Sequence, residues 1–197
     1  NEDLERLEPF NPLGHLTFFE ESDDDLSEAP ESAASTVSAD HELSEYQIIE
    51  LAKVTDLRYG ENPHQKAALY NDRTGVGIAC AEQLHGKEMS FNNYVDADAA
   101  WALVNDFEEL AVAIIKHTNP SGVGIGSSNL DAYKRALATD PVSAFGGIVA
   151  FNQKVDAKVA ASVIEVFSEV IIAPDYDDAA LEIFRSKKNL RILRLNN

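Results

Sequence analysis

Basic residues, cysteine and long apolar runs are scarce in this 197-residue sequence, and each scarcity excludes a class of protein. The single cysteine, Cys80, rules out an internal disulfide and a zinc site built from several cysteines. The longest strongly apolar run, 111–115, is far shorter than the roughly 20 residues that a membrane-spanning helix needs. The acidic N-terminal residues show no basic segment followed by an apolar one, so we expect no secretory signal. These features favour a protein of the reducing cytoplasm without a membrane partner.

The formal net charge of −18 is concentrated in the first part of the chain. Residues 1–45 hold 14 Asp and Glu against Arg6 as their only base, a net of −13, and residues 46–197 hold 20 acids and 15 bases, a net of −5. Neither part has the basic surface expected of a nucleic-acid binder. We therefore expect a poorly ordered acidic leader or linker over 1–45, followed by a globular domain over 46–197. An acidic arm that recruits a basic partner is an alternative role for the leader.

Apolar spacing predicts strands that alternate with helices after residue 60. The expected strands are 66–71, 76–80, 111–116, 147–151, 170–173 and 190–195, and the expected helices are 94–107, 130–137, 157–167 and 178–184, with an earlier helix over 41–54. This alternation implies β-α-β crossovers. The predicted fold class is therefore α/β, with three α/β/α layers around a mixed, largely parallel sheet.

Lys116 and His117 stand directly after the apolar strand, at the carboxyl end where ligands of open α/β sheets gather. Burying these two side chains is costly unless they have partners or a function, although a lysine at a strand end often only extends to solvent. The sequence Asn-Pro-Ser-Gly, 119–122, is typical of a turn. Gly124 and Gly126, ahead of two serines and a helix, either let backbone amides approach an anion or merely permit a tight loop.

A second cluster, 57–65, combines Arg58 and Tyr59 with a rigid Gly and Asn-Pro loop. The guanidinium of Arg58 presents a planar fork that suits phosphate, and the ring of Tyr59 can stack on a ligand. The same residues also fit a capped connector in which Arg58 pairs with an acidic neighbour. Composition leaves both interpretations open.

Five motifs together resemble the AICAR transformylase/IMP cyclohydrolase family, in the family's order and spacing. They are LRYGENPHQ (57–65), LHGKEMSFNNYVDADAAW (84–101), IIKHTNPSGVGIG (114–126), PVSAFGGIVAFN (141–152) and EVIIAP (169–174). The resemblance covers about residues 56–195, and we place no match in residues 1–50. It implies a cytidine-deaminase-like α/β/α fold that occurs twice in the transformylase domain, with residues 46–197 as the first copy. The deaminase zinc motifs H-x-E and C-x-x-C are absent from the sequence, so we expect no metal.

The resemblance further implies a formyltransferase that moves a formyl group from 10-formyltetrahydrofolate to the amine of the nucleotide AICAR, in a parent enzyme that is also an IMP cyclohydrolase. It implies a cytoplasmic homodimer with active sites at the subunit interface. Lys116 and His117 match the catalytic positions, as oxyanion-stabilising cation and general base. The positions that match AICAR contacts are Arg58, Tyr59, His117, Gly146 and Glu169. Because the folate site would lie mostly in the second copy, a catalytically silent nucleotide-binding module is the alternative function.

Overall fold

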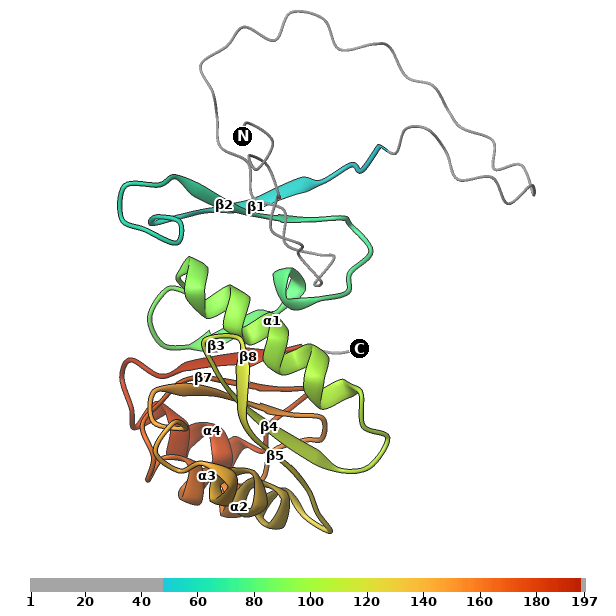
Figure 1. Cartoon of the computed structure of the whole chain (residues 1–197), viewed down its shortest axis with the longest axis vertical. Coiled ribbons are helices and arrows are strands. Elements are labelled where there is room, and N and C mark those ends of the chain that lie inside the picture. Colours follow the sequence, from blue (N-terminus) through green and yellow to red (C-terminus); the bar gives the residue numbers. More distant parts are fainter. Residues whose placement is uncertain (1–47, 196–197) are drawn as a thin grey trace, which may run out of the picture.

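The computed structural model describes residues 48–195, which form a six-stranded sheet, a separate two-stranded sheet and the helices around them (Figure 1). The strands are β1 (Ala52–Leu57), β2 (Ala67–Asn71), β3 (Glu82–His85), β4 (Ala111–Lys116), β5 (Asn119–Ile125), β6 (Gly147–Phe151), β7 (Ser168–Ala173) and β8 (Arg191–Arg194). The helices are α1 (Phe91–Asn105), α2 (Asn129–Thr139), α3 (Ala157–Val163) and α4 (Asp178–Arg185), with a short 3-10 helix, η1 (Ile78–Cys80). The predicted acidic leader, 1–45, lies outside the described residues.

The six-stranded sheet has the order β3-β8-β7-β6-β4-β5. β6, β7 and β8 run parallel, whereas β4 pairs antiparallel with both β5 and β6, and β3 pairs antiparallel with β8. The parallel strands are joined by the crossover helices α3 and α4, as parallel pairing requires, while two residues suffice to return β4 into β5. The predicted mixed sheet is confirmed, and its parallel part is confined to β6–β8.

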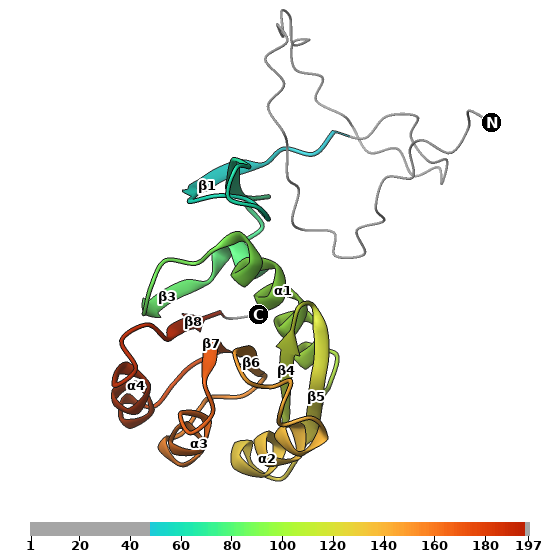
Figure 2. The same ribbon diagram turned by 60° about the vertical axis from the view of Figure 1, so that its left-hand side comes forward.

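Helices cover both faces of this sheet, which confirms the predicted three layers. In Figure 2, α1 lies on one face, and α2, α3 and α4 lie on the other. Successive side chains of a strand point to opposite faces, and β4 shows this directly. Val112 and Ile114 join the core beneath α2–α4, whereas Ala113 and Ile115 join the core beneath α1. An apolar run without polar interruption therefore forms a central strand that is buried on both sides.

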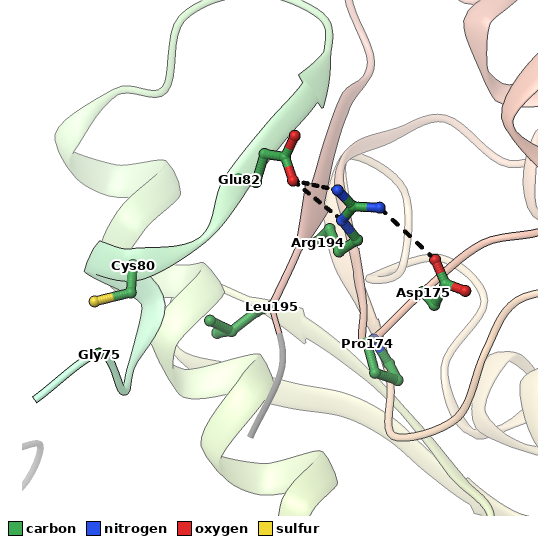
Figure 3. A pocket seen from close by; sticks show the side chains of 7 residues that line it. All are labelled: Gly75, Cys80, Glu82, Pro174, Asp175, Arg194 and Leu195. Atoms are coloured by element: carbon green, nitrogen blue, oxygen red, sulfur yellow. Dashed lines mark hydrogen bonds and ion pairs between the residues drawn. The ribbon is translucent and has the colours of Figure 1, made fainter.

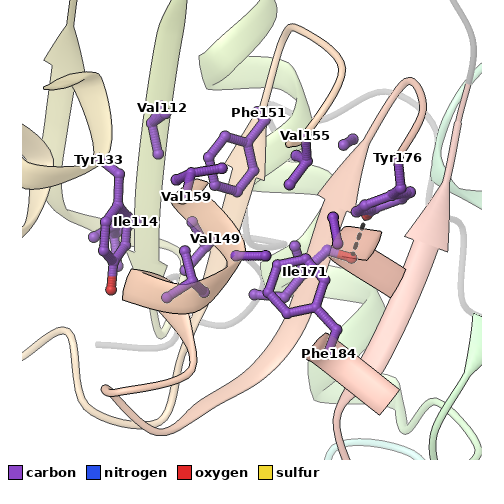
Figure 4. Close-up of a cluster of buried hydrophobic side chains, with 14 of the residues drawn as sticks. Val112, Ile114, Tyr133, Val149, Phe151, Val155, Val159, Ile171, Tyr176 and Phe184 are labelled. Atoms are coloured by element: carbon purple, nitrogen blue, oxygen red, sulfur yellow. Dashed lines mark hydrogen bonds between the residues drawn. The ribbon is translucent and has the colours of Figure 1, made fainter. Parts of the chain in front are cut away.

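The larger core packs all three helices of one face against the sheet (Figure 4). Tyr133 of α2, Val159 of α3 and Phe184 of α4 are each almost fully buried in this core. Burying a side chain of this size contributes about 1.5–3 kcal/mol. The hydroxyl of Tyr176 donates to a β8 carbonyl at 2.7 Å, so its polar atom is satisfied within the core.

The glycines after His117 serve packing. Gly122 and Gly124 lie within β5, and a Cβ on Gly122 would stand 1.9 Å from the carbonyl oxygen of Ala136 in α2. The amide of Gly126 donates to the carbonyl of Leu110 at 3.1 Å, so it is already bonded within the chain. The structure thus favours the close-packing interpretation of this glycine run over an anion cradle.

Two predicted elements are wrong in their described parts. Residues 48–51 are not helical, and strand β1 follows them, while the rest of the predicted helix over 41–54 lies outside the described residues. Residues 76–80 form no strand, because Gly75 and Gly77 have φ of 80° and 87° and lead into η1. The predicted helix over 157–167 ends earlier, at Val163. The short edge strand β3, with sequence EQLH, shows no apolar alternation that would predict it.

Candidate functional site

The strand ends on one side of the six-stranded sheet carry the predicted site residues of the sheet. We call this end of the sheet the polar rim, and the word edge below refers to such strand ends and not to an edge strand. The rim comprises 116–118 after β4, Gly146 before β6, Glu169 in β7, Arg191 at the start of β8 and 87–90 after β3. It contains the carboxyl end of β4 but the amino ends of β6, β7 and β8, because β4 runs against them. Of the strands that end at the rim, β3 and β4 contribute carboxyl ends, whereas the parallel strands contribute amino ends, so the predicted location at carboxyl ends applies only to β3 and β4.

His117 occupies a strained position at the tip of the β4–β5 hairpin. His117 and Thr118 have φ of 52° and 60°, in the left-handed region that non-glycine residues rarely adopt. The turn is held from outside, since the amide of Thr118 donates to Oδ1 of Asp96 in α1 at 2.8 Å. It is also held from within, since Nδ2 of Asn119 donates to the carbonyl of His117 at 2.7 Å. The imidazole itself is exposed on this fixed turn, and the turn lies two residues before the predicted one. Strain of this kind clusters at functional sites.

Lys116 is tied to the loop that precedes β6. Its ammonium donates to the carbonyl oxygen of Phe145 at 2.8 Å. The next residue, Gly146, has φ of 72°, and a Cβ built there would stand 2.8 Å from Nζ of Lys116. Its amide donates to the carbonyl of Phe167 at 2.7 Å, which fixes the loop against the start of β7. A side chain at position 146 would therefore both strain the backbone and displace the lysine.

Glu169 is the extra residue of a β-bulge. Gly147 pairs with Ser168 and Ile148 pairs with Val170, so Glu169 has no partner in β6. A bulge re-aims a side chain, and here the carboxylate accepts from Nδ2 of Asn93 in α1 at 2.8 Å. Asn93 is itself buried and completes a capping box with the N-cap Ser90 of α1, because its Oδ1 accepts from the amide and hydroxyl of Ser90. The first turn of α1 therefore sets the position of Glu169.

Arg58 and Tyr59 lie at a cleft of about 340 Å³ next to the rim. The cleft is lined by Arg58, Tyr59, Lys87, Glu88, Met89, Ser90 and Arg191. The guanidinium carbon of Arg58 stands 5.7 Å from the ring centroid of Tyr59, within cation–π range. Arg191 links this cleft to Glu169, with 3.8 Å between its Nη1 and Oε2 of the carboxylate. Lys116 and His117 do not line the cleft.

The rim residues thus fall into two groups, on either side of the sheet. By strand alternation Lys116 belongs to the face of Val112 and Ile114, whereas Arg191 belongs with Leu193 to the α1 face. Three strand spacings separate β4 from β8, or about 14 Å. Between them stand the start of β6, with Gly146 and Gly147, and the start of β7, with Ser168 and Glu169.

Sequence reasoning missed two features of the rim. Arg191 begins the four-residue strand RILR, and nothing in its sequence context places it at the rim beside Glu169. Phe145 and Phe167 are 62% and 54% exposed and stack with ring centroids 5.3 Å apart, beside a second groove of about 490 Å³. The sequence AFGG contains Phe145 and could have indicated an aromatic residue in this loop. The contact between Phe145 and Phe167 could not be predicted, because only the fold brings the two residues together.

The described residues also bear on metals and membranes. Within 48–195, no cluster of three or more His, Cys, Asp and Glu side chains is placed to hold a metal ion. The helices of the same residues include none with the length and apolar character that a bilayer span requires.

The described residues thus form an α/β/α domain with cationic side chains at the strand ends on one side of its sheet. A family model described as "AICARFT/IMPCHase bienzyme" matches residues 23–197. The chain belongs to this family, and the match begins well before the first recognisable motif at residue 57.

Curated relatives agree with this family. The chain is 48% identical over 157 residues to the bifunctional purine biosynthesis protein PurH of Petrotoga mobilis, covering 79% of this chain and 31% of that protein. The corresponding values are 54% over 155 residues for PurH of a Thermoanaerobacter species, with 78% and 30% covered. They are 56% over 144 residues for PurH of Desulfitobacterium hafniense, with 73% and 28% covered. The chain therefore spans about a third of the length of these relatives.

Proposed function

We propose that this chain carries part of the active site of an AICAR formyltransferase. The enzyme transfers a formyl group from the co-substrate 10-formyltetrahydrofolate to the 5-amino group of AICAR during IMP synthesis, and its parent protein is also an IMP cyclohydrolase. Family membership supports the reaction. The observation that carries the proposal for this chain is that one rim and its adjoining cleft gather all six residues matched to the family's site.

The reaction needs a base, because the amine of AICAR is conjugated with its imidazole carboxamide and is a weak nucleophile. As its nitrogen forms the bond to the formyl carbon, a proton must leave that nitrogen. His117 is the proposed acceptor, since its exposed imidazole stands on a turn that α1 holds in place. A well-placed general base contributes about 10²–10⁴-fold to the rate.

Lys116 is the proposed stabiliser of negative charge. When the amine attacks, the formyl oxygen becomes an oxyanion, and the bond from the formyl carbon to N10 of the folate then breaks as N10 gains a proton. The ammonium of Lys116 is held by the Phe145 carbonyl, a neutral partner that leaves its full charge available. Fixed charge of this kind can be worth about 3 kcal/mol at the transition state.

The other matched residues are proposed to bind AICAR. Gly146 presents backbone without a side chain to the ring, beside Lys116. Glu169 is held by Asn93 at an angle that the bulge creates, and it offers an acceptor to the polar groups of the nucleotide. Arg58 and Tyr59 supply a cation and a ring in the adjoining cleft. The enzyme is further proposed to act as a cytoplasmic homodimer, without metal.

A catalytically silent nucleotide-binding module is the second candidate, because the chain spans only about a third of its relatives. Calorimetry of the 197-residue chain with AICAR, followed by a formyl-transfer assay on a form of the protein that spans the length of its relatives, separates the two. Turnover in the longer form supports the transferase. AICAR binding without turnover in the longer form supports the module, and failure to bind AICAR contradicts both.

A further inference from the structure

We propose that Asp96 of α1 is a positioning residue, which fixes the imidazole of His117 for proton transfer. It acts through the backbone of the β4–β5 turn and not through contact with the substrate. The inference rests on the proposed function for the role of His117 as the base. The hydrogen bond that carries the inference, from the amide of Thr118 to Oδ1 of Asp96 at 2.8 Å, does not depend on that role.

The β4–β5 turn has a conformation that its residues disfavour. The strand register pairs Lys116 with Asn119 across a two-residue turn. The two central residues, His117 and Thr118, have φ of 52° and 60°. Positive φ at both central positions is the requirement of a type I′ turn, for which Asn-Gly is the typical sequence. A β-branched residue such as Thr118 rarely adopts this φ, so the surroundings of the turn must stabilise it.

Asp96 supplies that stabilisation from a helix, 22 positions earlier in the sequence. No lysine or arginine within 48–195 pairs with its carboxylate, which is therefore available to the turn. The imidazole of His117 is exposed, and no hydrogen bond to another described side chain orients it. The direction of the imidazole therefore follows from the backbone that Asp96 holds.

The place of Asp96 within α1 is not explained by the stability of the helix. Asp96 is the sixth residue of α1, beyond the first turn, where an acidic side chain would favour the helix dipole. In a helix interior aspartate has a low propensity, because its short side chain competes with the backbone for hydrogen bonds. A local preference that the fold overrides in this way is typical of functional positions.

Helix α1 is a rigid support for this contact. Ala97, Ala100 and Val104 on its inner face are fully buried against the sheet. Asn93, three residues before Asp96 and on the same side of the helix, donates to Glu169 at 2.8 Å. One helix therefore holds both the turn of the proposed base and the carboxylate proposed to bind the nucleotide. A misplacement of about 1 Å between reacting groups can cost about 10²-fold in rate.

Steady-state formyl transfer, in a form of the protein that spans the length of its relatives, tests the inference. Asp96→Ala is expected to lower kcat about 10- to 100-fold and to change KM for AICAR by less than about twofold. Asp96→Asn keeps an oxygen that can accept from the amide, so kcat should stay within about threefold of wild type. Asp106→Ala, at the exposed far end of the same helix, is the matched control and should leave kcat unchanged.

A double-mutant cycle separates positioning from a structural role. In a His117→Ala background, Asp96→Ala should lower kcat by no more than about twofold further, because Asp96 acts only through the imidazole. An equal loss in both backgrounds would assign Asp96 a structural role and overturn the inference.

Amide hydrogen exchange in the 197-residue chain tests the contact without any assay of activity. The amide of Thr118 should exchange about tenfold or more faster in Asp96→Ala than in wild type, and Asp96→Asn should restore its protection. Unchanged exchange in Asp96→Ala would overturn the inference and leave the proposed function intact. Normal turnover of His117→Ala would instead contradict the proposed base, and with it the role of Asp96, even where Thr118 is protected.

Discussion

The two edges of the six-stranded sheet carry similar charged side chains but satisfy them differently. At the edge opposite the rim, Arg194 lies between Glu82 and Asp175, beside a cavity of about 550 Å³ (Figure 3). Lys154 at that edge pairs with Asp175 at 3.2 Å and with Asp177 at 3.1 Å. At the polar rim, Lys116 and Arg191 donate to backbone carbonyls, and the carboxylate paired with Arg191 stands 3.8 Å away. Arg58 lies near the ring of Tyr59.

This difference separates charges that hold the fold from charges that are available to a ligand. A cation matched by carboxylates gains little from an incoming anion, which would have to displace them. A cation held by a neutral carbonyl keeps both its position and its charge, as preorganised sites require. We therefore propose that the rim is the functional edge, whereas the cations of the opposite edge are paired within the fold.

The largest effect is expected from His117→Ala, measured as formyl transfer in a form of the protein that spans the length of its relatives. Loss of the general base should lower turnover by about 10²-fold or more. The exposed side chain makes no contact that the fold needs, so the unfolding temperature should stay unchanged. Turnover close to that of wild type would remove the imidazole from the mechanism.

Lys116→Met is expected to reduce turnover about 100-fold, because the oxyanion loses a fixed cation. Lys154→Met, which removes a lysine from the opposite edge, is its matched control and should leave turnover unchanged. Steady-state kinetics on both variants provide the measurement. Equal effects of the two substitutions would erase the distinction between the edges.

The free energy of unfolding should show the opposite dependence, with the larger loss for a substitution at the edge opposite the rim. Arg194→Gln breaks the contacts with Glu82 and Asp175 and is expected to lower the free energy of unfolding slightly, since these groups are partly exposed. Arg58→Gln at the site should change it by less than about 0.5 kcal/mol. Urea unfolding of the two variants compares them. A larger loss for Arg58→Gln would mean that the cleft, too, serves stability.

The smallest predicted effect is on the stability of the fold at acidic pH. The amide of Tyr176 and then the ammonium of Lys154 lower the pKa of Asp175 below its ordinary value of 3.8. Its ionised form therefore stabilises the fold above about pH 4, and this contribution is lost as the pH falls through the lowered pKa. Urea midpoints at about pH 7 and about pH 3 should differ less in Asp175→Asn than in wild type. An identical difference would show that this carboxylate is not linked to folding.

The sequence predicted the central elements of the fold, and it failed where turns or edges decide. The run AVAIIK is apolar throughout because β4 is covered on both faces, so its pattern needs no tertiary information. Strand β5 was hidden by Gly122 and Gly124, which suit a loop by composition but a strand beneath α2 by packing. The left-handed φ of Gly75 and Gly77 turned an expected strand into η1, and no local pattern specifies those angles.

The residues of the candidate site also divide into those that the sequence indicated and those that only the fold reveals. The sequence alone marked Lys116 and His117, since polar residues that leave an apolar strand stand out, and the resemblance supplied Gly146 and Glu169. Neither reaches Arg191, which lines the cleft and pairs with Glu169 at 3.8 Å. Whether an arginine is satisfied depends on residues up to about a hundred positions away, such as the carbonyl of Glu88, and only the folded chain brings them together.

The most direct test of the two-edge account is to titrate AICAR into the isotope-labelled 197-residue chain and follow its backbone amide resonances. The account predicts shifts at His117, Gly146, Glu169 and Arg191 that saturate together, with Asp175 and Arg194 unchanged. Shifts confined to the opposite edge, or none anywhere at saturating nucleotide, would contradict it.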